Sequence, residues 1–186
     1  IIQNCEVLDY LWSGERIVGV KTTRGDIGAG KTAVAVAGHT SVLAHKAGLR
    51  LPIESHVLQA FVTESIKPVV HHVVVWSATY FYVSQSDKGG LVFGGYEPNP
   101  IAWTQGDVPG DFEFQLFEDD WDHFEQHMTQ ALARVPALEK AGIKKMINGP
   151  ESFTPDGNFI LGAAPELKNF YVGAGFNAFG IASGGG

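Results

Sequence analysis

Residues 33–38 read AVAVAG, and residues 170–175 read FYVGAG. Each is a short apolar run that ends in glycine, which is typical of a buried parallel strand followed by a turn. Ligands of α/β folds bind where such strands end, and glycine lets the backbone approach a cofactor closely. We therefore expect function at the ends of these two strands, although tight turn packing explains each glycine more simply when it is taken alone.

The composition is that of a folded, globular protein. The 186 residues are 45% hydrophobic and 18% charged, and the formal net charge is -7. This length allows about one domain with a sizeable core. The acidic balance lacks the electrostatic footprint of a general nucleic-acid binder and gives no reason to bind an anionic membrane. No apolar run approaches the ~20 residues that a membrane-spanning helix needs.

Cys5 is the single cysteine, so the sequence excludes an internal disulfide and every multi-cysteine zinc site. A chain with so little cysteine is typical of a reducing compartment, and we predict a cytoplasmic protein. The chain begins at Ile1 without a methionine and ends in three glycines, so we interpret it as a segment of a longer protein.

Hydrophobic patterning predicts both strands and helices. Residues 51–97 are rich in strand signals around a hairpin turn at 86–90, which favours an antiparallel sheet. The clearest helix spans 119–135, where apolar residues recur at offsets of three and four and Pro136 ends the pattern. The remaining expectations are β-structure over 5–38, a helix at 39–48, strands at 56–64, 69–77, 79–84 and 91–96, a loop at 98–110, strands at 143–161 around a turn at 154–157, and a strand at 170–175.

Gly25–Thr32 fits the phosphate-loop pattern G-x-x-x-x-G-K-[ST] at every position. A true phosphate loop follows a buried strand and opens a helix. The residues before Gly25 are polar, and those after Thr32 alternate as a strand does. We therefore favour a hairpin turn with a solvated Lys31. A phosphate-loop nucleotide-binding protein remains the alternative, and a helix after Thr32 would support it.

Two histidine pairs raise the question of a metal site. His71 and His72 are adjacent, so their side chains point to opposite faces of a strand. His123 and His127 share a helix face at a spacing of four, but the pair lacks the intervening glutamate of H-E-x-x-H. We expect a solvated helix face here and no metal site.

Tyr80 and Tyr82 lie two residues apart, so a continuous strand would present both rings on one face. Two tyrosines on one face can line a pocket and hold a small polar ligand through their hydroxyl groups. A half-buried sheet surface is an equally good interpretation of the same pattern.

Several segments resemble the D-amino-acid-oxidase superfamily of flavoenzymes. In residues 17–38 a hairpin precedes a strand that ends in Ala-Gly, as in the middle of the flavin domain. The segments LPIES at 51–55 and YVSQSDKGGLVFGG at 82–95 resemble the sarcosine oxidase β subunit. The segments NGPESFTPDG at 148–157 and GFNAFG at 175–180 resemble the sarcosine and dimethylglycine dehydrogenases.

The resemblance implies that FAD oxidises the C–N bond of a secondary or tertiary amino acid, such as sarcosine or dimethylglycine, with the flavin supplying the chemistry. Tyr80 or Tyr82 would line the substrate side of the flavin as catalytic residues. The implied cofactor contacts are Val7 to the adenine portion through its backbone, Ala37 and Gly38 flanking the cofactor, and Gly157, Gly175, Phe176, Asn177 and Gly180 near the isoalloxazine and pyrophosphate.

The same resemblance implies an α+β fold in three parts: 1–48 as a partial FAD-binding domain, 49–147 as a substrate-binding domain with a mixed or antiparallel sheet, and 148–186 as a return to the FAD-binding α/β domain. The G-x-G-x-x-G motif that holds the pyrophosphate in these enzymes is missing, so we expect residues 1–186 alone to bind FAD weakly or not at all. Expected partners are a small amino-acid substrate and either a second copy or other subunits. A non-catalytic regulatory relative remains open.

Overall fold

The computed structural model describes residues 1–78 and 80–185. The chain forms two compact units, and each is made of segments that are separate in the sequence. Unit 1 comprises residues 1–55, 102–112 and 151–186, and unit 2 comprises 56–101 and 113–150. Each unit has its own cluster of buried apolar side chains. The assignment of the three predicted segments to cofactor and substrate domains stays a prediction.

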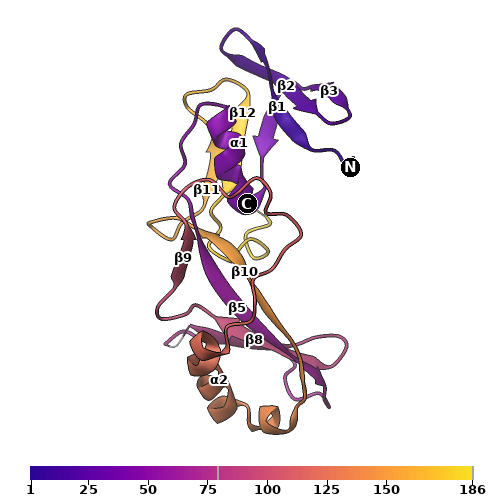
Figure 1. Ribbon diagram of the computed structural model, residues 1–186, viewed down its shortest axis with the longest axis vertical. Coiled ribbons are helices and arrows are strands. Elements are labelled where there is room, and N and C mark those ends of the chain that lie inside the picture. The colour runs from indigo at the N-terminus through magenta and orange to yellow at the C-terminus, as the bar shows by residue number, and fades with distance from the viewer. Residues whose placement is uncertain (79, 186) are drawn as a thin grey trace. The chain divides into compact units, whose positions relative to one another are not determined.

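Unit 1 contains two small sheets (Figure 1). The first is antiparallel, in the order β1 (Val7–Ser13), β2 (Arg16–Thr22), β3 (Gly25–Gly28). The second has the order β11 (Ile160–Ala163), β12 (Phe170–Ala174), β4 (Thr32–Val34), in which β12 runs antiparallel to β11 and parallel to β4. The 3₁₀ turn η1 (Ala37–His39) and helix α1 (Thr40–Lys46) follow β4. The parallel strand predicted at 170–175 and the short helix are confirmed. The run at 33–38 forms a parallel strand only as far as Val34, because residues 37–39 turn as η1, and of residues 33–36 only Val34 is buried.

The phosphate-loop alternative is wrong, because the segment after Thr32 is a strand. Gly25–Gly28 forms β3, and β4 begins at Thr32. No helix N-terminus therefore follows Lys31 to bind a phosphate group. Lys31 is exposed, and its Nζ lies 5.6 Å from the centroid of the Tyr171 ring.

Unit 2 is built on a sheet with the strand order β10-β5-β8-β7-β6. The pairs β5/β8, β8/β7 and β7/β6 are antiparallel, which confirms the antiparallel sheet expected over 51–97. The predicted strand at 69–77 shortens to the three residues of β6, and β9 forms within the expected loop at 98–110. The bounds are β5 Glu54–Ser65, β6 Val74–Trp76, β7 Phe81–Gln85, β8 Gly90–Gly95, β9 Ile101–Thr104 and β10 Ile143–Phe153.

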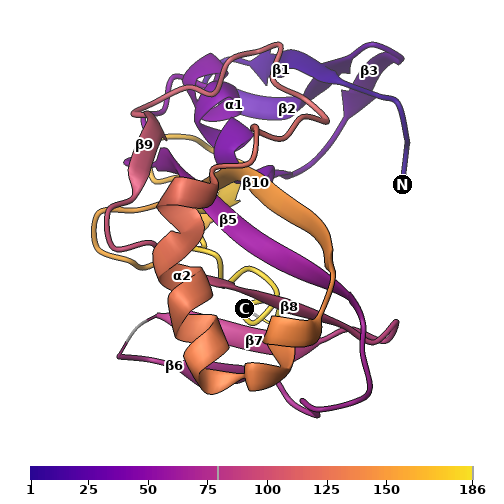
Figure 2. The same ribbon diagram turned by 60° about the horizontal axis from the view of Figure 1, so that its bottom comes forward.

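Helix α2 (Trp121–Arg134) covers one face of this sheet, and the 3₁₀ turn η2 (Pro136–Lys140) follows it (Figure 2). The apolar face predicted for 119–135 is the face that packs, since Phe124 and Ala131 are fully buried. The sheet contributes aromatic and aliphatic side chains to the same core, namely Phe61, Phe81, Val83, Leu91 and Phe93. Because side chains alternate along a strand, Tyr82 lies on the opposite face of the sheet from Phe81 and Val83.

The strand-rich, mixed-sheet architecture with few helices is the α+β class that the sequence predicts. Predicted strand 79–84 begins at Thr79, which lies outside the described residues; the strand that the structure describes starts at Phe81. Among the described residues, no helix is long and apolar enough to span a membrane.

Candidate functional site: loops at the carboxyl ends of two parallel strands

The two apolar runs that define the fold are neighbours in the sheet of unit 1. Phe170 pairs with Thr32 and Val172 pairs with Val34, in parallel register. Parallel neighbours end at the same edge of a sheet, which is where α/β folds bind ligands. Two loops therefore lie at the carboxyl edge of this sheet, residues 37–38 after β4 and residues 175–180 after β12. These loops contain most of the residues that the resemblance assigns to the cofactor.

The 175–180 loop is held by a buried network around Asn177. The Asn177 Oδ1 atom accepts a hydrogen bond from the Thr154 N–H at 3.0 Å. Its Nδ2 atom donates to the Gly175 carbonyl at 2.6 Å and to Thr154 Oγ1 at 3.1 Å. Thr154 Oγ1 in turn donates to the Asn158 carbonyl at 2.6 Å. The turn after β10, which contains Gly157, is thus joined to the loop after β12.

The backbone of this loop adopts an uncommon conformation. The φ angles are +64° at Gly175, +52° at Asn177 and +65° at Ala178. Left-handed φ values are cheap for glycine and tolerated by asparagine, but they are unfavourable for alanine. Such conformations persist only where surrounding contacts enforce them, and they concentrate at functional sites.

Packing accounts for two of the predicted cofactor glycines. A Cβ atom on Gly175 would lie 2.4 Å from Thr154 Cγ2, and one on Gly38 would lie 3.2 Å from side-chain atoms of Ser55 and Val108. Those glycines make room for protein atoms. Gly157 differs, because its φ is +70° and no atom lies within 4 Å of its Cβ position. Open backbone at this edge is therefore found at Gly157 rather than at Gly38 or Gly175.

The other assigned positions are more scattered. Ala37 has a φ of +49° and is exposed at the start of η1. Phe176 is half-buried and its ring stacks on Phe159 at 5.3 Å between centroids, while Gly180 is exposed. Val7 lies in β1, where it pairs with Thr22 in the other sheet of unit 1. The structure does not bring Val7 into the sheet that carries the two loops.

Tyr80 and Tyr82 do not share a face, so that part of the sequence prediction is wrong. Tyr82 lies in β7, half-buried, between Val75 and Gly94 on the neighbouring strands. Tyr80 precedes β7 with a φ of +48°, which breaks the alternation of an extended strand. Tyr80 instead lines a pocket of about 440 Å³ together with Tyr96 and residues of α2, including Gln126, His127 and Gln130.

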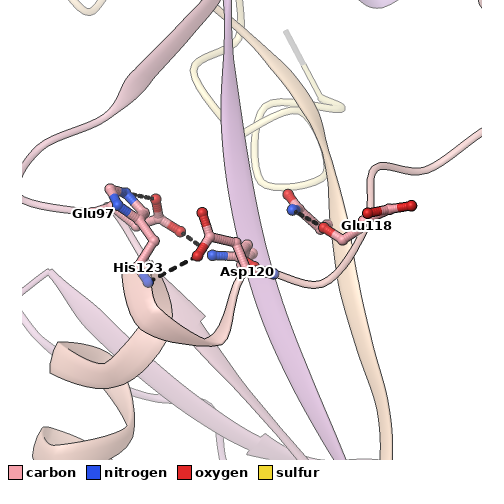
Figure 3. Close-up of polar contacts among 6 residues, drawn as sticks. Glu97, Glu118, Asp120 and His123 are labelled. Carbon is pink, nitrogen blue, oxygen red and sulfur yellow. Dashed lines mark hydrogen bonds and ion pairs between the residues drawn. The ribbon is translucent and has the colours of Figure 1, made fainter.

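A buried polar cluster in unit 2 was missed by sequence reasoning (Figure 3). The Glu97 side chain has no exposed surface, and its Oε2 lies 2.5 Å from His123 Nε2. Gln59 Nε2 donates to Glu97 Oε1 at 3.3 Å, and Gln59 Oε1 accepts the Asp120 N–H at 3.0 Å. Asp120 caps α2 by accepting the His123 N–H at 3.0 Å. These contacts form a closed ring that joins β5, the segment after β8 and the start of α2.

A second contact ties the segment before α2 to β10. Asn148 Nδ2 donates to the Glu118 carbonyl at 2.6 Å (Figure 3). The Phe117 N–H donates to the Asn148 carbonyl at 2.8 Å. Burial raises the pKa of Glu97, and the nearby His123 opposes that rise. No local sequence pattern links Glu97 to His123, because only the folded sheet and helix bring them together.

The expectation of a solvated face for His123 and His127 is wrong. His127 is buried, and its ring lies 6.3 Å from that of Phe81 and 5.6 Å from that of Phe124. Burial, followed by the charge of His123, lowers the pKa of His127. The available signal was its position three residues after Phe124 and four before Ala131, on the apolar face. Within residues 1–78 and 80–185, no three His, Cys, Asp or Glu side chains are placed to hold a metal ion.

Comparison with known protein families shows the family to which the chain belongs. The family model described as "FAD dependent oxidoreductase" matches residues 1–186, the whole chain. The chain belongs to this family of FAD-dependent oxidoreductases. The match includes both parallel strands, both loops and the sheet of unit 2.

Individual relatives agree with this family membership. The chain is 43% identical to the sarcosine oxidase subunit beta of Rhizobium meliloti over 95% of its length, and 38% identical to human mitochondrial sarcosine dehydrogenase over 100%. It covers 39% and 21% of those proteins. The crystal structure of L-proline dehydrogenase from P. horikoshii is similar, with a TM-score of 0.79, 26% identity and coverage of 95% of this chain and 45% of that one. The chain thus spans less than half of each.

The described loops fit part of an FAD site in this oxidoreductase family. The 175–180 segment carries no charged side chain, and its last residues are exposed at the carboxyl end of β12. Gly157 is open, and a Cβ atom on Gly180 would meet only Phe176 Cβ at 3.9 Å. Backbone that is both exposed and uncharged suits contact with a flat, uncharged ring system.

Proposed function

We propose that the protein containing this chain uses FAD to oxidise the C–N bond of a secondary or tertiary amino acid. The observation that carries the proposal is the convergence of the 37–38 and 175–180 loops at the carboxyl edge of β4 and β12. When bound, FAD would supply the electron acceptor for this oxidation. Asn177 and Thr154 would hold the loop that borders the cofactor, and open backbone at Gly157 and Gly180 would lie against it.

The face of the unit 2 sheet opposite α2 supports a role in substrate binding. Tyr82 lies there beside Gly94, which is itself paired with Ala60, so small residues lie on one side of the tyrosine and Val75 on the other. Burial raises the pKa of Tyr82, so its phenol stays protonated at neutral pH. A protonated phenol donates a hydrogen bond, and an amino-acid carboxylate accepts one. We assign Tyr82 to the substrate carboxylate and Tyr80 to the separate pocket beside α2.

The substrate class follows from the relatives named above. One is a sarcosine oxidase subunit and another is a sarcosine dehydrogenase, so both are named for an N-methyl amino acid. We extend that class to this protein, together with association with other subunits, because one relative is itself a subunit.

The test is a flavin spectrum and an anaerobic reduction assay on the full-length protein. A yellow protein that loses its absorbance near the flavin maximum when sarcosine or dimethylglycine is added supports the proposal. Glycine serves as the matched substrate control, because it lacks the N-methyl group. A protein that holds FAD but is not reduced by any secondary or tertiary amino acid contradicts the substrate assignment. A protein that binds no FAD favours the regulatory alternative.

Variants at the two tyrosines separate their roles. Tyr82→Phe removes the hydroxyl and keeps the ring. We expect it to raise the KM for the amino acid by about 10- to 100-fold, because a hydrogen bond to a charged group is worth about 1.5–3 kcal/mol. Tyr80→Phe is the matched control, and we expect it to leave KM unchanged. Equal effects of the two substitutions would contradict the assignment.

A further inference from the structure

Segment 102–112 is held against the 37–38 turn by contacts that the proposed function does not use. It belongs to unit 1, although the residues before and after it, 56–101 and 113–150, belong to unit 2. The Val108 side chain is buried, and a Cβ atom on Gly38 would lie 3.2 Å from Val108 Cγ2. The segment therefore packs directly on one of the two loops at the carboxyl edge of β4 and β12.

The Ser41 hydroxyl joins the turn to this segment. Its Oγ donates to the Gly38 carbonyl at 3.0 Å and to the Gly106 carbonyl at 3.1 Å. A hydroxyl has one proton, so Ser41 shares a single donor between two carbonyl groups that are distant in the sequence. A bond from a helical serine to a carbonyl in the preceding turn is a common local contact, but the bond to Gly106 requires the folded chain. Ser41 is only 4% exposed, so both bonds are shielded from water.

A second contact joins the same two segments one turn further along α1. His45 Nδ1 lies 2.6 Å from Asp107 Oδ2, and both side chains are partly exposed. Ser41 and His45 are four residues apart and therefore lie on one face of the helix. Residues 106–108 thus contact that face of α1 and the turn before it.

The turn before α1 is unfavourable by itself. Ala37 has a φ of +49°, a left-handed value that alanine rarely adopts. On one side of Ala37, the fully buried Thr40 accepts the Val36 N–H at 3.3 Å, and on the other side Ser41 bonds to Gly38. Left-handed residues persist only where surrounding contacts enforce them. The Ser41 hydroxyl is one of these contacts, and it also connects the turn to segment 102–112.

We propose that Ser41 is a positioning residue for the flavin, because its hydroxyl fastens segment 102–112 to the 37–38 turn and thereby fixes backbone that borders the cofactor. This inference rests on the proposed function, since it takes the 37–38 turn to contact FAD. It goes further by assigning a role to a serine that bonds to the turn and not to the cofactor. It also assigns a role to a segment that the sequence indicated only as part of a loop.

The experiment compares full-length wild type with Ser41→Ala, Ser41→Thr, Ser41→Val and Ser13→Ala. Threonine and valine have nearly the same shape and only threonine keeps the hydroxyl, so their difference separates the hydrogen bonds from the added methyl group. Ser13→Ala is the matched control, because Ser13 is an exposed serine in β1 of the same unit. The measurements are the FAD dissociation constant, the visible spectrum of the bound flavin, and hydrogen–deuterium exchange resolved by peptide across unit 1.

We expect Ser41→Ala and Ser41→Val to weaken FAD binding about five- to tenfold, because two carbonyl groups lose their shared donor. Exchange should rise in the peptides that cover 37–48 and 102–112 and not in the rest of unit 1, and the flavin spectrum should shift. Ser41→Thr should keep the wild-type spectrum and an FAD affinity within about threefold of wild type, since it still makes the bonds. Ser13→Ala should match wild type. Equal FAD affinities for Ser41→Thr and Ser41→Val overturn the inference, and so does a loss of protection spread across unit 1.

If Ser41→Ala and Ser41→Val do not fold, His45→Ala replaces them, because it releases segment 102–112 at a partly exposed contact. That variant should raise exchange in 102–112 and weaken FAD binding about two- to threefold, and wild-type behaviour in both readouts overturns the inference. If wild type binds no FAD, the proposed function fails. The exchange of 102–112 in Ser41→Thr and Ser41→Val still determines whether the hydroxyl holds the segment.

Discussion

The two units hold carboxylates in different surroundings. Glu97 in unit 2 faces the side chains of His123 and Gln59, whereas Glu151 in unit 1 accepts the backbone N–H of its neighbour Ser152 at 3.2 Å. A carboxylate bonded to side chains from other elements fixes how those elements pack. A carboxylate bonded to backbone amides fixes the conformation of one segment. Glu97 therefore joins separate elements of unit 2, whereas this contact of Glu151 lies within the single strand β10.

The apolar cores of the two units also differ in composition. Unit 2 has a dense aromatic cluster, in which the Phe124 ring lies 5.8 Å from that of Phe93 and 6.3 Å from that of Phe61. In unit 1 an edge-to-face pair, Tyr10 and Phe170 at 5.3 Å, is surrounded mainly by aliphatic residues. Burial, followed by the charge of Asp9, raises the pKa of Tyr10 to about 12. Unit 2 is thus stabilised by ring packing, and unit 1 by strand pairing around smaller side chains.

The largest expected effect tests whether these cores are separate. Phe124→Ala removes a fully buried ring from unit 2, and Phe170→Ala does the same in unit 1. Each should lower the free energy of unfolding by about 3–5 kcal/mol, the usual cost of such a cavity. Hydrogen exchange resolved by peptide should show that each substitution exposes amides of its own unit first. Equal loss of protection in both units after either substitution would mean that they form one cooperative core.

The second effect concerns the contact between the buried Glu97 carboxyl group and His123. Glu97→Ala leaves His123 Nε2 and Gln59 Nε2 without an acceptor, and the cost should be about 3 kcal/mol. Glu97→Gln keeps an oxygen for Gln59 and should cost less. Glu125→Ala is the control, because Glu125 is an exposed carboxylate on the same helix. Chemical denaturation measures all three. A Glu97→Ala protein as stable as the control would show that the ring of contacts does not stabilise unit 2.

Several helices and strands of the two units could be predicted from local sequence. The spacing of apolar residues predicted a helix over 119–135, and α2 spans Trp121–Arg134 with Asp120 as its cap. The runs at 33–38 and 170–175 predicted parallel strands, and their first residues pair as β4 and β12, although β4 ends at Val34. These features depend on periodicity and on residues close in sequence, so a single chain contains the information.

Other features depend on contacts between distant residues. Nothing near Glu97 indicates that it meets His123, since their contact requires the sheet and helix to be assembled. The φ of +48° at Tyr80 separated two tyrosines that alternation placed together, and no local rule gives that value for a tyrosine. The Gly38 and Gly175 signals were ambiguous for a related reason: close approach of a side chain and close approach of a cofactor both select glycine.

Two glycines in turns of unit 1 test whether close approach of a side chain makes glycine necessary. Gly175→Ala combines a φ of +64° with a Cβ atom 2.4 Å from Thr154 Cγ2, whereas Gly157→Ala combines a φ of +70° with open space. Each substitution should lower the free energy of unfolding by about 1–2 kcal/mol, because alanine disfavours the left-handed backbone conformation. The additional clash should make Gly175→Ala the more destabilising, and it should also disturb the Thr154–Asn177 bonds. Thermal unfolding compares the two variants. Equal decreases in stability would show that the Thr154 side chain moves aside without destabilising the fold.

The smallest effect is a pH dependence in unit 2. Burial lowers the pKa of His127 below its ordinary value of 6.5, so the folded state binds this proton less readily than the unfolded state does. The stability that His127 contributes in its neutral form is present above pH 6.5 and is lost as the pH falls through the lowered pKa. Glu97 acts in the opposite direction, because its raised pKa favours proton uptake in the folded state as the pH falls.

His127→Gln isolates the histidine, since Glu97 is present in both proteins and its contribution cancels in the difference. Below pH 6.5 the free energy of unfolding of wild type should fall more steeply than that of His127→Gln, by at most about 1.4 kcal/mol per pH unit for one proton. His71→Gln, at an exposed position outside the strands, should follow wild type. Urea titrations between about pH 5 and pH 8 provide the comparison. Parallel curves for wild type and His127→Gln would place His127 in contact with water and would remove the distinction between the buried histidine of α2 and the exposed one before β6.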